Sequence, residues 1–215
     1  MPNGQDAQAA FDKNLLHIKN IVESQAGISG KTYAISDIHG MYNLYIKAIQ
    51  QLNENNTLII LGDVIDRGKD GIAILKDIIK RQKSGNGPRI IFLLGNHEMQ
   101  MIECLKILEK YRPTMEELEL ICEAGESLRA NWNDSEINKK IILEKPYSNF
   151  SKNEIFLLYV WIKASKGKET FAEFDALSTE EQQDINELLT KKSYMYLKKK
   201  LIMEKYYLFT LYHHI

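Results

Sequence analysis

The chain has 215 residues, of which 44% are hydrophobic and 27% charged, and a formal net charge of −1. A chain of this length can bury a core of its own, so a small disulfide scaffold is excluded. The balanced charge gives no field that would attract nucleic acid. Because the sequence has no run of about 18 apolar residues and no secretory start, we expect a cytoplasmic protein without a membrane partner.

The first predicted element is an amphipathic helix within residues 7–25, where apolar side chains recur at spacings of three and four. Three short runs that are rich in apolar and β-branched residues then predict strands. These runs span residues 31–36, 57–61 and 89–94. A segment of helical period separates each run from the next. This βαβαβ order predicts a parallel sheet that is covered on both faces.

From about residue 98 to residue 192 the pattern is helical. Thr114, Ser151 and Ser178 each precede a glutamate by three residues, which is the signature of a capping box at the start of a helix. We interpret this part as a helical insertion or cap. The two cysteines of the chain, Cys104 and Cys122, fall within it, and we expect buried, reduced thiols without a function.

Aromatic and β-branched residues at 194–202 and 206–212 predict a β-hairpin near the end of the chain. The fold class is therefore α/β, and we divide the chain into three parts. These parts are residues 1–99, an N-terminal helix with the core; residues 100–192, the helical insertion or cap; and residues 193–215, a hairpin that returns to the core.

A polar motif follows each of the three predicted strands. The motifs are Asp37-Ile38-His39-Gly40, Gly62-Asp63-Val64-Ile65-Asp66-Arg67-Gly68 and Gly95-Asn96-His97-Glu98. In open parallel sheets, ligands bind beyond the carboxyl ends of the strands. The three motifs therefore predict one shared site at that edge of the sheet.

The motifs contain side chains that suit metal ions. The candidate ligands, which supply carboxylate, imidazole and amide groups, are Asp37, His39, Asp63 and Asn96. Such groups bind Mn²⁺, Fe or Zn²⁺, and a central carboxylate can bridge two ions. Two ions about 3.5–4 Å apart would clamp a phosphate and lower the pKa of a shared water.

Three further side chains suit the chemistry of phosphate esters. His97 would protonate the leaving oxygen, and Asp66 would accept the other ring proton of His97 and fix the imidazole tautomer. Arg67 supplies a planar fork that matches phosphate oxygens. Together with the candidate metal ligands, these residues predict a phosphate-directed site.

The three motifs resemble D-x-H-G, G-D-x-x-D-R-G and G-N-H-E, the pattern of the calcineurin-like metallophosphoesterase superfamily. More narrowly, they resemble the phosphoprotein phosphatase family, which includes bacterial and phage serine/threonine phosphatases. The resemblance covers residues 31–99 and implies a βαβαβ core with two divalent metal ions, with manganese favoured over iron or zinc. The roles that it implies are Asp37 and His39 for the first metal, Asp63 as the bridge, Asn96 for the second metal, His97 as the acid and Arg67 for phosphate. To these we add Asn96 as a second phosphate-binding candidate and Asp66 as the catalytic partner of His97.

The chain departs from this family after residue 192. The family completes its second metal site with two histidines, in H-A/G-G-type and G-H-T-type segments, and neither segment is present. Leu211 stands where the first of these histidines is expected, and whether His213 or His214 replaces it stays open. We expect a member that is truncated at its C-terminus. Such a member would lack the second half of the sandwich, have an incomplete second metal site and show reduced activity.

The resemblance implies a metal-dependent phosphatase that acts on phosphoserine or phosphothreonine in a phosphoprotein or phosphopeptide, through a metal-activated water. Two alternatives stay open. Symmetrical dinucleoside polyphosphate hydrolases use the same three motifs. A catalytically silent protein that binds phosphate, or a partner through residues 100–192, would agree with the missing histidines.

Overall fold

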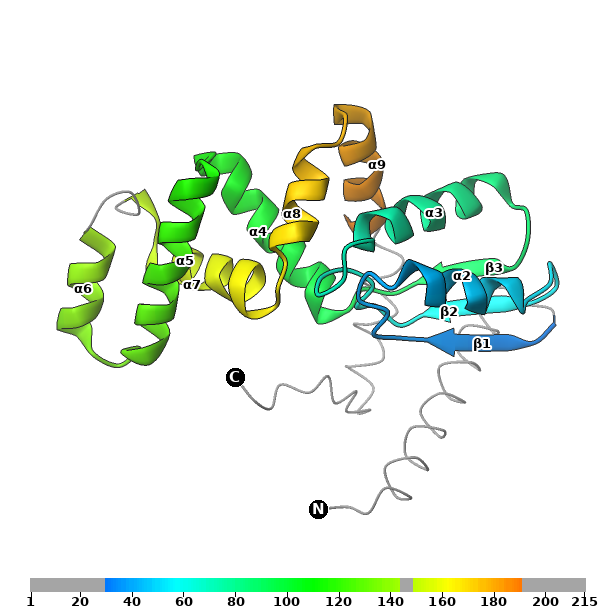
Figure 1. The fold of residues 1–215 in the computed structure, drawn as a ribbon, viewed down its shortest axis with the longest axis horizontal. Helices are drawn as coiled ribbons and strands as arrows, with labels where there is room; N and C mark the ends of the chain where they lie inside the picture. Colours follow the sequence, from blue (N-terminus) through cyan, green and yellow to red (C-terminus); the bar gives the residue numbers. More distant parts are fainter. Residues whose placement is uncertain (1–29, 144–148, 191–215) are drawn as a thin grey trace, which may run out of the picture.

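The computed structural model describes residues 30–143 and 149–190 (Figure 1). The predicted N-terminal helix and the predicted hairpin lie outside these residues, as do Leu211, His213 and His214. Within the described ranges the chain forms a small sheet with helices packed beside it, so the predicted α/β class is confirmed. Among the described helices, none combines the length and the apolar character that crossing a membrane requires.

The sheet consists of three parallel strands in the order β1-β2-β3. The strands are β1 (Thr32–Ile35), β2 (Thr57–Ile60) and β3 (Arg89–Phe92). Each ends one or two residues before its predicted end. Leu58, Ile59 and Ile60 point alternately to the two faces of the sheet, and none is more than 2% exposed. The central strand is therefore covered on both faces, as predicted.

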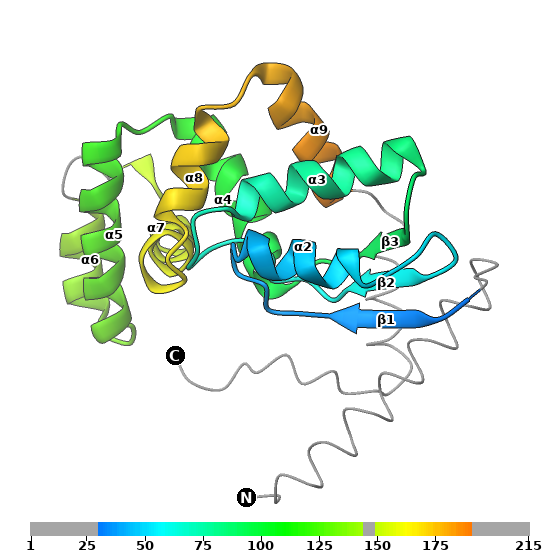
Figure 2. The ribbon, with the colours of Figure 1, turned by 45° about the vertical axis from the view of Figure 1, so that its right-hand side comes forward.

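Two helices connect the strands, α2 (Tyr42–Gln50) and α3 (Gly71–Ser84). Both lie on the same side of the sheet (Figures 1 and 2). Successive right-handed crossovers in one direction place their helices on one face, which explains this arrangement. On α3, the residues Ile74, Leu75 and Ile78 are fully buried and form the stripe that packs against the sheet.

The rest of the described chain is helical. Its elements are α4 (Asn96–Tyr111), α5 (Met115–Ala130), α6 (Ser135–Leu143), α7 (Lys152–Leu158), the π-helix η2 (Tyr159–Ala164), α8 (Lys168–Asp175) and α9 (Thr179–Thr190). Helix α4 begins at the edge of the sheet and runs into this helical part, so it crosses the proposed boundary at residue 99 (Figure 1). The three predicted capping boxes are present, at Thr114, Ser151 and Ser178.

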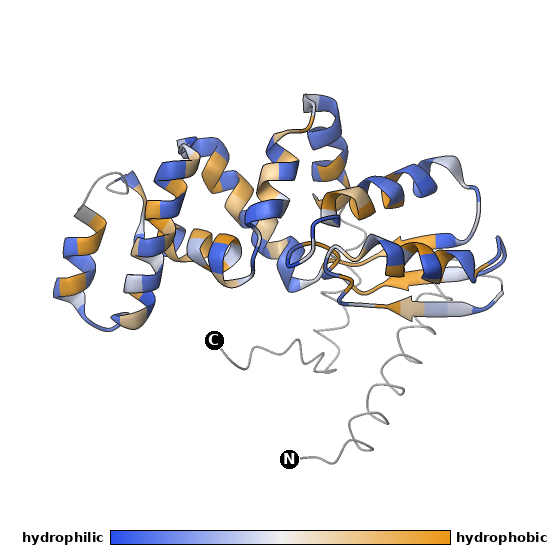
Figure 3. Ribbon diagram, in the orientation of Figure 1, coloured by the Kyte–Doolittle hydropathy of each residue, from blue (hydrophilic) through white to orange (hydrophobic). Residues whose placement is uncertain are grey.

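One hydrophobic core joins the sheet to the helical part. Ile60 and Phe92 of the sheet belong to the same buried cluster as Met101, Ile121 and Trp161 of the helices. Apolar residues fill β2 and β3 and alternate with polar residues along the helices (Figure 3). Because the cluster is continuous, the helical part and the sheet pack around one shared core.

The two cysteines lie inside this core, as predicted. Both thiols are unpaired and buried, and the Cys104 thiol donates a hydrogen bond to the carbonyl of Leu157 at 3.4 Å. Burial raises the pKa of Cys122 to about 12. A thiol with such a pKa stays protonated at neutral pH, so it is a poor nucleophile.

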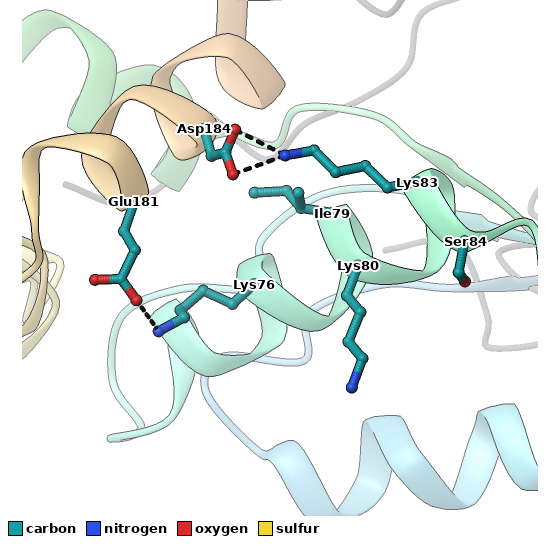
Figure 4. Close-up of a pocket in the computed structure, with 7 residues that line it drawn as sticks. All are labelled: Lys76, Ile79, Lys80, Lys83, Ser84, Glu181 and Asp184. Carbon is teal, nitrogen blue, oxygen red and sulfur yellow. Dashed lines mark hydrogen bonds and ion pairs between the residues drawn. The ribbon is translucent and has the colours of Figure 1, made fainter.

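Helix α9 is joined to α3 by two ion pairs at the rim of a cavity of about 460 Å³ (Figure 4). The ammonium of Lys76 lies 2.6 Å from the carboxylate of Glu181, and that of Lys83 lies 2.8 Å from that of Asp184. All four side chains are substantially exposed, so each pair adds little to stability. The cavity lies between these two helices and contains none of the motif residues.

We expect Glu181 to make the stability of the protein depend on pH in acid. Hydrogen bonds from Lys76, and then from Ser178, lower the pKa of Glu181 from 4.5 to about 2. A carboxyl group whose pKa is lowered by folding stabilises the protein above its unfolded pKa, and this contribution is lost as the pH falls through the folded pKa. Because the pair is exposed, the Glu181→Gln variant should unfold at only slightly lower urea than wild type at pH 6 and match it near pH 2. Glu180→Gln, the exposed neighbour, is the control, and an equal deficit at both pH values would refute the assignment.

Candidate metal and phosphate site

The three motifs meet at one edge of the sheet through their backbones. The His39 N–H donates to the carbonyl of Asp63 at 3.0 Å, and the Gly40 N–H donates to that of Val64 at 2.7 Å. These bonds continue the pairing between β1 and β2 beyond the ends of the strands. The first motif is thereby fixed to the second.

The carboxylate of Glu98 fixes the second motif to the third. Its oxygens accept backbone N–H groups from Asp63 at 2.8 Å, Val64 at 2.9 Å, Ile65 at 3.4 Å and Gly95 at 2.7 Å. Glu98 is fully buried, which raises its pKa, and the charge of Asp63 raises it further, while the backbone donors oppose the shift. The four donors satisfy both oxygens of the carboxylate, as a buried charge requires.

Glycine is required where the motif backbones approach one another. A Cβ atom on Gly62 would lie 2.0 Å from the backbone nitrogen of Gly95, and the φ of Gly62 is +98°. A Cβ atom on Gly40 would lie 2.5 Å from the backbone of Gly68, and its φ is +69°. Any side chain at these two positions would push the motifs apart.

The motif backbones are also strained. Of the seven non-glycine residues with positive φ in the described ranges, five belong to the motifs. These five are Asp37, His39, Asp63, Asp66 and Arg67. A left-handed residue other than glycine costs roughly 1–2 kcal/mol and persists only where its surroundings fix it. Such residues concentrate at functional sites, so this clustering supports a site at the sheet edge.

His97, Asp66 and Arg67 form a connected group. The Nδ1 atom of His97 lies 2.7 Å from Oδ2 of Asp66, and both side chains are buried. The Nη2 atom of Arg67 lies 3.4 Å from Nε2 of His97. Because a guanidinium only donates, we assign the proton of the neutral imidazole to Nδ1 and the lone pair to Nε2. The pairing of His97 with Asp66 that the sequence predicts is thus present as a contact.

His39 is oriented as metal-binding histidines are. Its Nδ1 lies 2.9 Å from the carbonyl oxygen of Ile65, to which it donates, so Nε2 keeps its lone pair. That Nε2 lies 3.8 Å from Oδ1 of Asp37, whose side chain is 67% exposed and also accepts a hydrogen bond from Ser36. Burial lowers the pKa of His39, which keeps the ring neutral and able to bind a metal.

Asp63 and Asn96 complete the predicted ligand set. Oδ1 of Asp63 accepts the backbone N–H of His97 at 3.0 Å, and Asn96 is the half-buried first residue of α4. Within residues 30–143 and 149–190, no three His, Cys, Asp or Glu side chains are grouped closely enough to hold a metal ion. The structure therefore pairs Asp37 with His39 and brings Asp63 to the His97 amide. The chemistry of the donor set, with two carboxylates, one neutral imidazole and one amide, fits a divalent ion.

Three residues contribute to this site without a role in the prediction from sequence. One of them, Glu98, belongs to the third motif. Thr170 of α8 accepts the N–H of Asp66 at 3.1 Å from 104 residues away, and the Lys166 carbonyl accepts that of Arg67 at 3.4 Å. The position of Glu98 within the third motif was a usable signal, whereas no local pattern marks Thr170 or Lys166.

We expect Glu98→Gln to destabilise the fold. Glutamine keeps the shape of the side chain but replaces one acceptor oxygen by an NH₂ group that faces backbone donors. At least one buried N–H then loses its partner, which costs roughly 1–3 kcal/mol, in addition to the weaker bonds to a neutral group. Urea unfolding measures this loss. Glu103→Gln, an exposed residue of the same helix, should change stability by less than about 0.5 kcal/mol. Equal stabilities of the two variants would show that the Glu98 contacts do not hold the motifs together.

Residues 30–193 match the protein family described as calcineurin-like phosphoesterase. Among curated proteins, the chain is similar to the symmetrical bis(5'-nucleosyl)-tetraphosphatases of Salmonella paratyphi B, Salmonella newport and Salmonella typhimurium. In each case the identity is 29% over 85 residues, which cover 38% of this chain and 28% of the relative. No solved structure gives a significant match.

Proposed function

The chain belongs to the calcineurin-like phosphoesterase family, and from this premise we propose that it hydrolyses phosphate monoesters, with phosphoserine or phosphothreonine in a protein as the substrate. One observation carries the proposal. The imidazole of His97 is held by Asp66 on one side and faces the guanidinium of Arg67 on the other. Once protonated at Nε2, this imidazole would be a proton donor beside a phosphate-binding fork.

Members of this family generally use two divalent metal ions. The residues that would hold them here are Asp37, His39, Asp63 and Asn96, with manganese as the proposed metal. When bound, such ions neutralise phosphate charge and lower the pKa of a coordinated water. The His39 side chain supports this assignment, because its Nδ1 is engaged by a carbonyl and its Nε2 is left for a ligand bond.

Residues of the chain would bind the phosphoryl group and protonate the leaving oxygen. Arg67 would bind two non-bridging oxygens of the phosphoryl group in its planar fork. A hydroxide would attack phosphorus, and the bond from phosphorus to the ester oxygen would break, leaving its electron pair on that oxygen. Protonated His97 would donate its Nε2 proton to this oxygen. The buried carboxylate of Asp66 would stabilise the imidazolium and hold its orientation.

A second candidate substrate is a dinucleoside polyphosphate. It is favoured by the relatives, which are symmetrical bis(5'-nucleosyl)-tetraphosphatases, although the matched segment spans 28% of their length. The same proton donor and phosphate fork would serve a phosphoanhydride. The two candidates differ in the leaving group, so a direct comparison of substrates separates them.

We expect Asp63→Asn to abolish most of the activity. Asparagine keeps the oxygen that accepts the His97 N–H but removes the charge that would bridge the metals. The loss in kcat should be roughly 10²-fold or more, as for removal of other electrostatic contributions to a transition state. The assay measures phosphate release in Mn²⁺ from a phosphoserine peptide and, separately, the formation of ADP from diadenosine tetraphosphate.

Asp175→Asn, an exposed residue of α8, is the matched control and should keep the wild-type rate. A preference for the peptide supports the protein phosphatase, and a preference for the dinucleotide supports the second candidate. If the wild-type protein hydrolyses neither substrate, the enzyme proposal fails and a silent binding protein is the better account.

A further inference from the structure

The helical part reaches into the second motif at two points. The N–H of Asp66 donates to Oγ1 of Thr170 at 3.1 Å, and the N–H of Arg67 donates to the carbonyl of Lys166 at 3.4 Å. Both acceptors lie near the start of α8. The backbone of two consecutive motif residues is thus held by a segment that lies outside all three motifs.

Asp66 and Arg67 need such acceptors because of their conformation. Their φ values are +67° and +64°, so two neighbouring non-glycine residues occupy the left-handed region. Their N–H groups take part in neither the sheet nor a helix. Asp66 is fully buried, so water does not replace a missing acceptor. The hydroxyl of Thr170 is the acceptor that the structure supplies, and the Thr170 residue is only 2% exposed.

The position of Thr170 is fixed by the chain that precedes it. The π-helix η2 ends at Ala164, and the Gly167 N–H then donates to the carbonyl of the fully buried Trp161 at 3.0 Å. A Cβ atom on Gly167 would lie 2.6 Å from the indole nitrogen of Trp161. Single turns of π-helix are rare and are frequent at functional sites. The route into α8 is therefore tightly defined by the core.

The orientation of the Asp66 side chain depends on its backbone. One oxygen contacts Nδ1 of His97, whereas the other, Oδ1, is buried without a hydrogen-bond partner among the described residues. With a single side-chain bond, the carboxylate is not locked by a network of its own. A shift of the Asp66 backbone would move the carboxylate and, through it, the imidazole of His97.

We propose that Thr170 is a positioning residue for phosphate-ester hydrolysis. Its hydroxyl holds the left-handed backbone at Asp66, and this sets the direction of the His97 imidazole and of the adjacent Arg67. The helical part is then a component of the active site rather than only a cover or a partner-binding surface. This inference rests on the proposed function for its catalytic consequence, while the structural link is testable without catalysis.

The test compares three variants of the full chain. Thr170→Val removes the acceptor at nearly constant shape, and Thr170→Ser keeps it. Thr57→Val makes the same change at a buried threonine at the opposite end of β2. We expect kcat to fall by about tenfold or more in Thr170→Val, because small displacements of catalytic groups have effects of this size. Thr170→Ser and Thr57→Val should stay within about threefold of wild type.

Amide hydrogen exchange, followed by NMR, tests the link independently of activity. The Asp66 amide should exchange faster in Thr170→Val than in wild type and recover in Thr170→Ser, with the amides of β2 unchanged. If the wild-type protein proves inactive, the proposed function fails while this readout still decides the role of Thr170. If Thr170→Val does not fold, Thr170→Ala compared with Thr170→Ser gives the same contrast. Unchanged Asp66 exchange without the hydroxyl, or equal kcat losses in Thr170→Val and Thr57→Val, would overturn the proposal.

Discussion

Four backbone N–H groups converge on the buried carboxylate of Glu98, and the candidate site depends on them. Through these bonds the ends of β2 and β3 are held by one side chain. The N–H groups of His39 and Gly40 donate to carbonyls of the second motif, which connects the end of β1 to the other two strand ends. The three motifs are therefore connected at the sheet edge by bonds to their backbones, without contributions from the side chains proposed for metal, phosphate or proton transfer. A buried carboxylate that loses any of these donors is destabilised, so the constraint is specific as well as strong.

These backbone bonds offset the conformational strain of the left-handed residues at the edge of the sheet. Asp37, His39 and Asp63 take left-handed conformations while their neighbours are held by backbone bonds, and Asp66 and Arg67 do so while bonded to the start of α8. In this frame the His39 ring lies beside Asp37, and the His97 ring lies beside Asp66. The two imidazoles meet edge to face, with their centroids 4.6 Å apart. The groups proposed for metal binding and for proton transfer thus share one rigid backbone frame.

Much of this arrangement was predictable from the sequence, for a physical reason. Strand periodicity and capping boxes are local signals, so β2 and the helix starts at Thr114 and Ser151 could be predicted from nearby residues alone. The motifs follow strand ends, and parallel strands place their ends together. The contact of Asp66 with Thr170 had no such signal, because its partners are 104 residues apart and meet only through the packed core around Trp161. Glu98 is marked by its place in the third motif, but its bonds to Asp63, Val64 and Ile65 depend on a backbone conformation that no local pattern encodes.

The central claim is that the three strand ends form one metal-binding edge. It is tested most directly by adding Mn²⁺ in small steps to the full chain and following paramagnetic broadening of the backbone amide resonances. The account predicts that broadening begins at Asp37, His39, Asp63 and Asn96, spreads to Asp66 and His97, and is strongly weakened in Asp63→Asn. Broadening that begins at the amides of α5 or α9, whose exposed carboxylates could bind Mn²⁺ instead, with the motif amides unaffected, would contradict the account.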